Sequence, residues 1–164
     1  MSNNPIFTFL DDLNLAYQAY DHEPVLDYET AAMVDEKYHI EGVESKSLLM
    51  KAKSGKYILL VTTSDQRMDR KYMKELIGEK VSIASPEELM ALSGYEAGCA
   101  APNCYPKDVL FLIDNFLFTL DKIIISGGVP TQSASFDPAI LKTVYAHVDN
   151  EVKYLDDVHV MVEA

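Results

Sequence analysis

Apolar residues follow two patterns along this chain: a spacing of three to four residues, which predicts helices, and short continuous runs. Phe9, Leu10 and Leu13 have this spacing behind Pro5, which suits the start of a helix. Ser85-Pro-Glu-Glu88 is the strongest start, because a capping serine, a proline and a glutamate at the third position occur together. The predicted helices cover residues 5–15, 27–38, 69–78, 85–92 and a segment that begins at Asp137-Pro138.

Shorter runs rich in Val, Ile, Leu and Phe predict strands. Residues 45–63 contain two such runs around Lys53-Ser-Gly-Lys56, a pattern typical of a β-hairpin, and Gly127-Gly128-Val-Pro130 predicts a turn. Strands and helices interleave without a regular βαβ rhythm. We therefore expect an α/β fold of the α+β type, with a mixed, curved β-sheet and flanking helices. The other predicted strands are 16–20, 80–84, 108–114, 116–120, 122–126 and, with weaker alternation, the tail 151–164.

Length and composition place the chain among ordinary globular proteins. Its 164 residues suffice for one domain with a substantial core, and no repeat or long linker divides them. The longest apolar run is too short to span a bilayer, and the N-terminus lacks the basic region of a secretory signal. Because two cysteines make no disulfide framework, we expect a cytoplasmic protein without a membrane partner.

The charge is distributed unevenly. The net charge of −12 argues at first against a nucleic-acid partner, DNA included, yet residues 46–80 hold nine of the fourteen basic residues against four acids. This segment could present a positive surface to a phosphate backbone while the rest of the chain repels it. The alternative interpretation, a lysine-rich hairpin followed by a solvated helix face, fits the charge pattern equally well.

The cysteines and histidines do not indicate a metal site. Cys99 and Cys104 lie five positions apart, but His22, His39 and His147 stand singly, without the spacing of metal ligands. A nucleophilic or redox-active cysteine would need a nearby base, and structural thiols are the simpler interpretation. No glycine-rich phosphate-binding loop is present, so the sequence predicts neither a metal nor an organic cofactor.

The segment Gly94–Pro102, GYEAGCAAP, is made almost entirely of small residues and carries one charge. Small residues let a backbone approach another group closely, and N–H groups in a glycine-bearing loop can face a carbonyl or an anion. Such a loop could bind a small acyl group through its main chain. A β-bulge or a tightly packed helix exit would have the same composition, and both interpretations remain open on physical grounds.

Four motifs in order, AYDHEP, SKSLLM, GYEAGCAAP and ISGG, closely resemble the YbaK/prolyl-tRNA-editing family. The resemblance covers about residues 6–148 and leaves an acidic C-terminal extension, 149–164, so residues 1–164 are interpreted as one editing domain. It implies a partly open, barrel-like sheet with flanking helices and a pocket between them. It further implies hydrolysis of mischarged aminoacyl-tRNA. Because Lys46 opens the basic segment 46–80, we expect that segment to dock the acceptor end of the tRNA. A prolyl-tRNA synthetase is a further partner that it allows.

The resemblance also implies roles for individual residues. Lys46 corresponds to the family's lysine and Gly98 begins its Gly-x-x-x-Pro loop; both would be catalytic, Lys46 by electrostatic stabilisation and Gly98 through its backbone. The substrate would be mischarged tRNA-Pro with a small wrong amino acid, alanine or cysteine, whose ester a water attacks with help from a ribose hydroxyl. The implied substrate-binding residues are Tyr20, His22, Ser47, Cys99, Ala100, Ala101, Pro102, Gly127, Gly128 and Ser133.

One departure from the family pattern concerns the substrate's amino group. Some members have an acidic residue about five positions beyond the glycine pair, where this chain has Ser133. Loss of that carboxylate would change how the amino group is held. Together with the acidic surface, it motivates an alternative hypothesis: a non-catalytic module that keeps the pocket for a small ligand or a protein partner.

Overall fold

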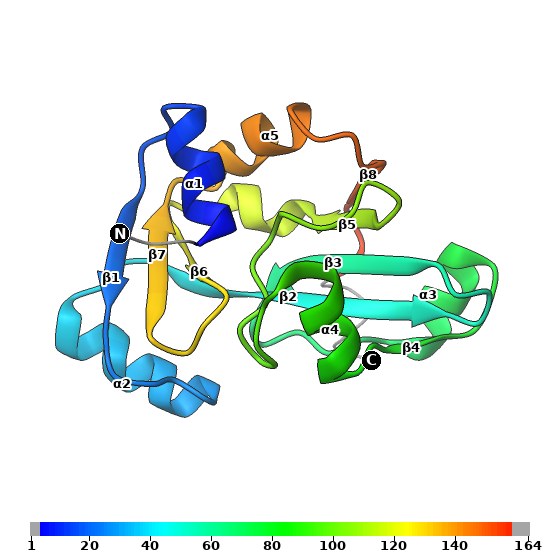
Figure 1. Ribbon diagram of the computed structural model, residues 1–164, viewed down its shortest axis with the longest axis horizontal. Coiled ribbons are helices and arrows are strands. Elements are labelled where there is room, and N and C mark those ends of the chain that lie inside the picture. The colour runs from blue at the N-terminus through cyan, green and yellow to red at the C-terminus, as the bar shows by residue number, and fades with distance from the viewer. Residues whose placement is uncertain (1–3, 159–164) are drawn as a thin grey trace.

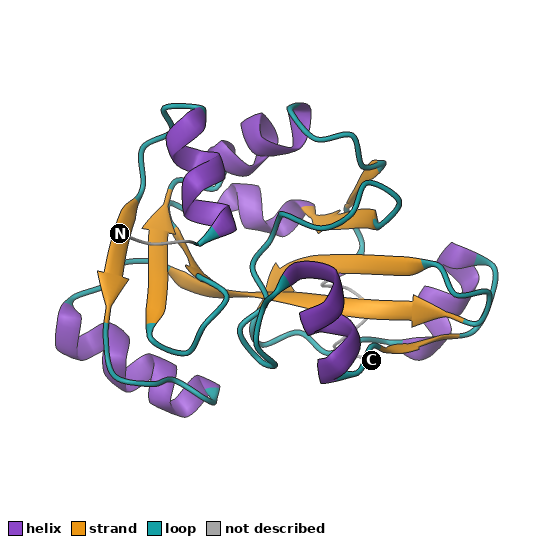
Figure 2. Ribbon diagram, viewed as in Figure 1, coloured by secondary structure: helices purple, strands orange, loops and turns teal. Residues whose placement is uncertain are grey.

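The computed structural model describes residues 4–158 and contains the five predicted helices (Figures 1 and 2). The first turns of the first four helices are capped by the side chain of the N-cap residue, whereas the N-cap of the fifth helix is Pro138, which makes no such bond. Asp27 accepts a hydrogen bond from the N–H of Thr30, and Ser85 and Glu88 form a reciprocal capping box. The helices are α1 Pro5–Asp12, α2 Tyr28–Tyr38, α3 Arg70–Ile77, α4 Pro86–Ser93 and α5 Ala139–Ala146.

Within residues 4–158, eight strands form one open, mixed sheet in the order β1-β7-β6-β2-β3-β5-β8, with β4 added beside β2. The long strand β2 joins two differently oriented halves, because its start pairs with β6 and its remainder with β3 and β4 (Figure 2). The expected fold class is thus confirmed. The strands are β1 Gln18–Asp21, β2 Val43–Ala52, β3 Tyr57–Thr63, β4 Val81–Ile83, β5 Leu110–Asp114, β6 Ile123–Ser126, β7 Gln132–Phe136 and β8 Val152–Leu155.

Two local predictions differ from the structure. Residues 116–120 were expected to form a strand, but Asn115–Thr119 is a 3₁₀ helix, η1. The Asp114 carboxylate caps this helix by accepting a hydrogen bond of 2.9 Å from the Phe116 N–H. Residues 132–136, to which the sequence assigned no strand, form β7 between β1 and β6. The small residues of β7 have little strand preference of their own, and its two neighbours determine its conformation.

The faces of β2 and β3 pack against two separate apolar clusters. Leu49, Leu59 and Val61 belong to the larger cluster, which also contains α1, α5 and the loop after α4. Met50 and Leu60, on the opposite face, join the smaller cluster with α3. Because alternate residues point to opposite faces of a strand, β2 is buried on both sides along its second half.

The segment after α5 extends the sheet. Strand β8 pairs in parallel with β5, and Leu155 and Val158 pack in the smaller cluster. The predicted tail strand therefore exists over 152–155, while the part of that prediction beyond residue 158 lies outside the described residues.

Candidate functional site

A cavity of about 380 Å³ opens beside β2, at the point where the two halves of the sheet meet. The start of α2 and the β6–β7 turn form one side; the end of β4, the start of α4 and the loop after α4 form the other. Figure 1 shows α2 and α4 on the two sides of this stretch of β2. Six residues predicted from the sequence line the cavity: Lys46, Ser47, Gly98, Cys99, Ala100 and Ser133.

The cavity occupies a notch in the sheet. Strand β6 pairs with β2 only at Val43 and Glu44, and β4 pairs with it from Met50 to Ala52. Between these ladders, the edge of β2 that faces away from β3 has no partner strand among residues 4–158. The lining residues Ser126 and Ala84 mark the two ends of the notch, and Ser47 lies between them.

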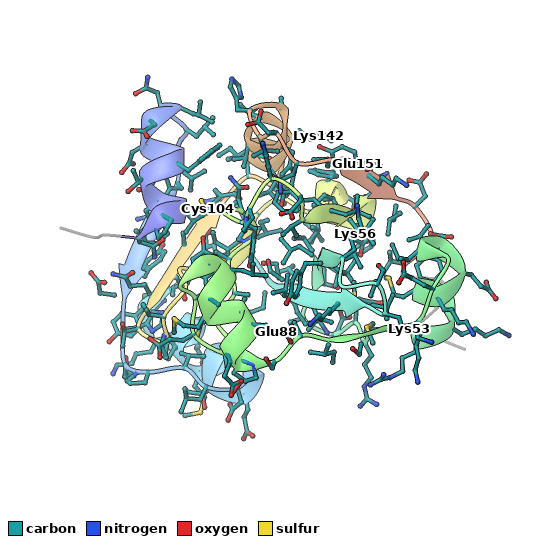
Figure 3. All side chains as sticks on the ribbon, turned by 45° about the vertical axis from the view of Figure 1, so that its right-hand side comes forward. Lys53, Lys56, Glu88, Cys104, Lys142 and Glu151 are labelled. Atoms are coloured by element: carbon teal, nitrogen blue, oxygen red, sulfur yellow. The ribbon has the colours of Figure 1, made fainter. Side chains whose placement is uncertain are left out.

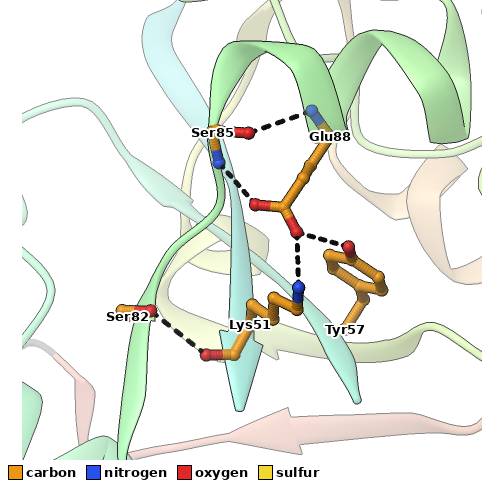
Figure 4. Close-up of polar contacts among 5 residues, drawn as sticks. All are labelled: Lys51, Tyr57, Ser82, Ser85 and Glu88. Carbon is orange, nitrogen blue, oxygen red and sulfur yellow. Dashed lines mark hydrogen bonds and ion pairs between the residues drawn. The ribbon is translucent and has the colours of Figure 1, made fainter. Parts of the chain in front are cut away.

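The start of α4, which forms one wall, is anchored to the sheet by the cluster in Figure 4. Glu88 accepts hydrogen bonds from the Ser85 N–H at 3.0 Å and from the Tyr57 hydroxyl at 2.5 Å, and its carboxylate lies 2.9 Å from the Lys51 ammonium. The hydrogen bond to the Ser85 backbone, followed by those from Tyr57 and Lys51, lowers the pKa of Glu88 to about 2. These contacts fix Ser85 and Pro86 at the rim of the cavity.

Three buried tyrosines hold the loop that contains Gly98–Pro102. Each donates its hydroxyl hydrogen to one of three consecutive carbonyl oxygens, at 2.7 Å in every case. Burial raises the pKa of all three hydroxyls, which therefore remain donors. The pairs are Tyr105 with Ala101, Tyr145 with Pro102, and Tyr95 with Asn103. Ala101 and Pro102 are thus buried behind the cavity, while Ala97 to Ala100 line it.

Gly98 adopts a φ of +79°, in the left-handed region that glycine prefers. A Cβ built at Gly98 would meet nothing within 4 Å, so the space beside this residue is open. The N–H of Cys99 already donates to the carbonyl of Glu96 at 2.9 Å. Within residues 4–158, the N–H groups of Ala97, Gly98 and Ala100 are the remaining donors of the lining segment.

Lys46 lies in β2 opposite Thr62 of β3 and is half-buried. Its ammonium donates a hydrogen bond to the main-chain carbonyl of Gln66, in the loop that follows β3. Burial lowers the pKa of the Lys46 ammonium and the charge of Arg67 lowers it further, while Asp65 opposes both effects. A cation at this position is partly shielded from water, which strengthens its interaction with an anion in the cavity.

Tyr20 and His22 lie behind the cavity wall instead of in its lining. His22 Nε2 is 2.8 Å from the Ser133 hydroxyl, and its Nδ1 is 2.8 Å from the carbonyl of Glu23. Tyr20 is the register partner of Ser133 across β1 and β7. Both residues therefore position Ser133, which does line the cavity.

The glycine pair also supports the site from outside its lining. A Cβ on Gly128 would collide with the ring of Tyr95, and one on Gly127 would come within 2.8 Å of the Asn4 amide nitrogen. The carbonyl of Gly128 accepts a hydrogen bond from the Glu96 N–H at 2.9 Å. Gly128 thus allows a close approach to the loop after α4, and Gly127 allows one to the N-cap of α1.

The two thiols are poorly suited to ionisation. Burial raises the pKa of Cys99, which lines the cavity, and of Cys104, which lies behind the loop. Within residues 4–158 no three His, Cys, Asp or Glu side chains gather as a metal site would require. No helix in the same part of the chain is long and apolar enough to cross a membrane.

The sequence analysis gave no site role to three acidic residues of the lining: Asp27 at the N-cap of α2, Asp35 within α2, and Glu44 in β2. Burial, followed by the hydrogen bond and the charge of Asp35, raises the pKa of Glu44 to about 9. A signal was present, because Glu44 lies two positions before Lys46 and so on the same face of the strand. Its partner Asp35 could not be found in this way.

The fold and the cavity define an α+β domain with a pocket lined by one lysine, three acidic residues, small side chains and apolar side chains. Within this class, the chain belongs to the aminoacyl-tRNA editing domain family, whose model matches residues 22–144. This confirms the resemblance that the four motifs indicated.

Individual relatives agree with this assignment. The prolyl-tRNA editing protein ProX of Acetoanaerobium sticklandii is 29% identical over 94 residues, 57% of this chain and 57% of the relative, so the match spans little more than half of either. The uncharacterised protein YwhH of Bacillus subtilis is 30% identical over 119 residues, 70% of this chain and 76% of YwhH. The crystal structure of a candidate trans-editing enzyme for prolyl-tRNA synthetase shares the fold, with a TM-score of 0.73 at 21% identity, over 95% of this chain and 98% of that one.

Proposed function

We propose that this protein is a trans-acting aminoacyl-tRNA deacylase, which hydrolyses the ester bond of a mischarged tRNA. The observation that carries the proposal is the cavity itself, in which Lys46 and the Gly98–Ala100 backbone line one space. Membership of the editing-domain family supports an aminoacyl ester as the ligand of that space.

The proposed reaction needs no protein nucleophile. An aminoacyl ester on ribose is activated by its neighbouring hydroxyl, which can help a water molecule attack the carbonyl carbon. The protein would hold the ester and stabilise the negative charge that develops on the carbonyl oxygen. The free N–H donors of Gly98 and Ala100 suit this role, since three tyrosines fix the next part of the loop.

Lys46 would supply the positive charge in this mechanism. Its ammonium can stabilise the developing oxyanion or bind the terminal phosphate or ribose of the substrate. Partial burial favours both interactions, because the local dielectric constant is lower than in water.

The acceptor end of the tRNA would dock beside the cavity, on the basic segment 46–80. Lys53 and Lys56 stand in the β2–β3 turn (Figure 3), and the N–H of Lys53 donates to the carbonyl of Lys80 at 2.9 Å. Helix α3, which lies in the sequence between the β2–β3 turn and Lys80, adds Arg70, Lys71 and Lys74. Neighbouring elements thus concentrate positive charge, which phosphates attract.

The proposed substrate is tRNA-Pro that carries alanine or cysteine. Ser47, Cys99 and Ser133 are among the residues that line the cavity of about 380 Å³, and we expect it to hold a small side chain. The relative ProX is a prolyl-tRNA editing protein, which supports tRNA-Pro as the first tRNA to test and a prolyl-tRNA synthetase as a further partner.

The test is deacylation of tRNA-Pro charged separately with alanine, cysteine, serine and proline, by the wild type and by Lys46→Ala. We expect release of one small wrong amino acid, strong loss of that activity in the variant, and no hydrolysis of Pro-tRNA-Pro. If none of the four esters is hydrolysed faster than without protein, the proposal for tRNA-Pro fails. The non-catalytic binding module, motivated by Ser133, would then be the better hypothesis.

A further inference from the structure

The notch in the sheet leaves one residue of β2 without a neighbouring strand to bond its main-chain N–H and C=O. The ladder with β6 ends at Glu44 and the ladder with β4 begins at Met50, preceded by a hydrogen bond of 3.0 Å from the Ala84 N–H to the Leu49 carbonyl. Ser47 lies in the middle of the gap and lines the cavity.

The hydrogen-bond pattern determines where the main-chain groups of Ser47 point. In an antiparallel ladder, the N–H and C=O of one residue face the same neighbour, and successive residues alternate. The Ala52 N–H donates to Lys56 and the Glu44 carbonyl accepts from Ser64, so even-numbered residues of β2 face the β3 side.

Odd-numbered residues of β2 face the other way. Leu49 accepts from Ala84 and Lys53 donates to Lys80, both on the β4 side. The N–H and C=O of Ser47 therefore both point into the notch, and neither meets a hydrogen-bond partner within residues 4–158. Ser47 thus presents one donor and one acceptor, side by side, to the cavity.

An α-aminoacyl group carries the complementary pair on a single residue, an amine that donates and a carbonyl oxygen that accepts. We infer that Ser47 binds the aminoacyl group of the substrate as a one-residue antiparallel β-bridge. The Ser47 N–H donates to the ester carbonyl oxygen, and the Ser47 carbonyl accepts from the α-ammonium. The inference rests on the proposed function and specifies which part of the substrate the main chain recognises.

The bridge has two chemical consequences. The Ser47 N–H joins the Gly98 loop as a second source of donors for the oxygen that becomes negative during ester hydrolysis. The α-ammonium is placed in a cavity that Asp35 and Glu44 also line, where the negative charge of Asp35, which helps to keep Glu44 protonated, stabilises it. An acyl group without the amine loses half of the bridge and the benefit of that charge.

The test uses two stable adenosine analogues, 3′-(L-alanylamino)-3′-deoxyadenosine and the 3′-propionylamino compound that differs only in lacking the amine. Their binding is followed by calorimetry and by ¹H–¹⁵N NMR of the complete chain. We expect the alanyl compound to bind about tenfold more tightly, to move the Ser47 amide proton downfield and to slow its exchange with solvent. The amides of Lys46 and Leu48 serve as internal controls, because they already face β3.

A pair of variants tests the N–H itself. Ser47→Pro removes the N–H that points into the notch and leaves the ladder with β3 intact, whereas Ser47→Ala removes only the hydroxyl. We expect Ser47→Pro to bind the alanyl compound at least tenfold more weakly than Ser47→Ala does. Should Ser47→Pro fail to fold, the NMR measurement on the wild type decides alone.

Three results would overturn the bridge: equal affinity for the two analogues, no binding of either at millimolar concentration, or a Ser47 amide unchanged at saturation. The deacylation assay remains a separate measurement. Hydrolysis of charged tRNA with a silent Ser47 amide keeps the proposed function and removes the bridge. Binding through Ser47 without hydrolysis of any ester supports the bridge and contradicts the proposed function.

Discussion

The hydroxyl of Tyr145, in α5, donates a hydrogen bond of 2.7 Å to the carbonyl oxygen of Pro102, 43 residues earlier in the chain. Both groups are buried and cannot bond to water, so each depends on the other for its hydrogen bond. Together with the matching bonds of Tyr95 and Tyr105, it turns three carbonyls of the loop inward. The preceding segment of the loop is thereby left facing the cavity.

Removal of these hydroxyls should therefore impair catalysis more than stability. For Tyr145→Phe we expect a loss of about 1 kcal/mol in the free energy of unfolding. We also expect a fall in kcat of about tenfold or more with little change in KM, because a loop displaced by a fraction of an ångström no longer meets the ester. Urea denaturation and single-turnover deacylation measure the two effects.

Tyr72→Phe is the matched control for this prediction. Tyr72 is also buried, and its hydroxyl donates to Asp157 at 2.5 Å, in the smaller core cluster away from the loop. We expect a similar loss of stability and an unchanged kcat. Equal effects of the two variants on kcat would show that Tyr145 has only a structural role.

The second prediction concerns the charge of Lys46. Lys46→Ala should lower kcat about 100-fold, the usual effect of removing one group that stabilises an oxyanion. Because the pKa of Lys46 is lowered by burial, activity should also decline on the alkaline side sooner than an exposed lysine would cause. Lys153→Ala, at an exposed position of β8, is expected to leave both rate and pH profile unchanged. A fully active Lys46→Ala would remove this residue from the mechanism.

The third prediction follows from the buried carboxyl of Glu44. Its pKa is about 9 in the folded protein and near 4.5 when unfolded, so between these values the folded state binds more protons. Stability contributed by this proton is therefore present at low pH and lost as the pH rises toward 9. Glu44→Gln, which is neutral throughout, should be about equal to the wild type in stability at pH 4 and should gain on it by up to about 1.4 kcal/mol for each pH unit above 4.5.

Urea denaturation of wild type and variant from pH 4 to pH 8.5 measures this difference. Glu36→Gln, on the exposed face of α2, is the control for the loss of one acid from the same region. A constant difference between Glu44→Gln and wild type over the whole range would mean that Glu44 is not protonated in the folded protein.

Local signals sufficed for part of this fold, and long-range contacts decided the rest. The capping residues Asp27 and Ser85 act within one turn, so the sequence located the starts of α2 and α4. Residues 116–120 are apolar enough to predict a strand. Their composition does not show that the preceding Asp114 caps a 3₁₀ helix, η1. That carboxylate also accepts from Thr62, 52 residues away, which no local pattern shows.

The candidate site divides in the same way. The loop at Gly98 was visible in the sequence because small residues cluster there. Lys46 was found because it belongs to the motif SKSLLM. The carboxyl pair was not visible, since Asp35 and Glu44 meet only where α2 packs beside β2. The open edge at Ser47 was equally hidden, because it depends on where two other strands end.

The fourth prediction tests the basic segment through salt. Release of counterions from phosphates makes tRNA binding weaken steeply as salt rises, and each lost phosphate contact reduces the slope by roughly one. We expect Arg70→Ala and Lys71→Ala in α3 each to weaken binding and flatten this dependence. Lys122→Ala, which only removes an exposed ion pair with Glu41, should change neither. Affinity that does not depend on salt would favour a protein or small-molecule ligand instead.

The fifth prediction separates backbone strain from function by comparing two glycines. Gly94 and Gly98 have nearly the same left-handed φ, +78° and +79°, and a Cβ at either would meet nothing within 4 Å. Alanine at either position should therefore cost about the same, roughly 1 kcal/mol of stability. Gly94 ends α4 outside the cavity, whereas Gly98 lines it with a main-chain N–H.

Only Gly98→Ala should therefore lose activity, by about tenfold or more, because its methyl group enters the space of the ester and its N–H is displaced. Thermal unfolding and deacylation of the two variants, measured side by side, decide the matter. If activity falls in proportion to stability in both, the loop needs glycine only for its turn. A loss confined to Gly98→Ala would tie the small residues of GYEAGCAAP to the binding of the substrate.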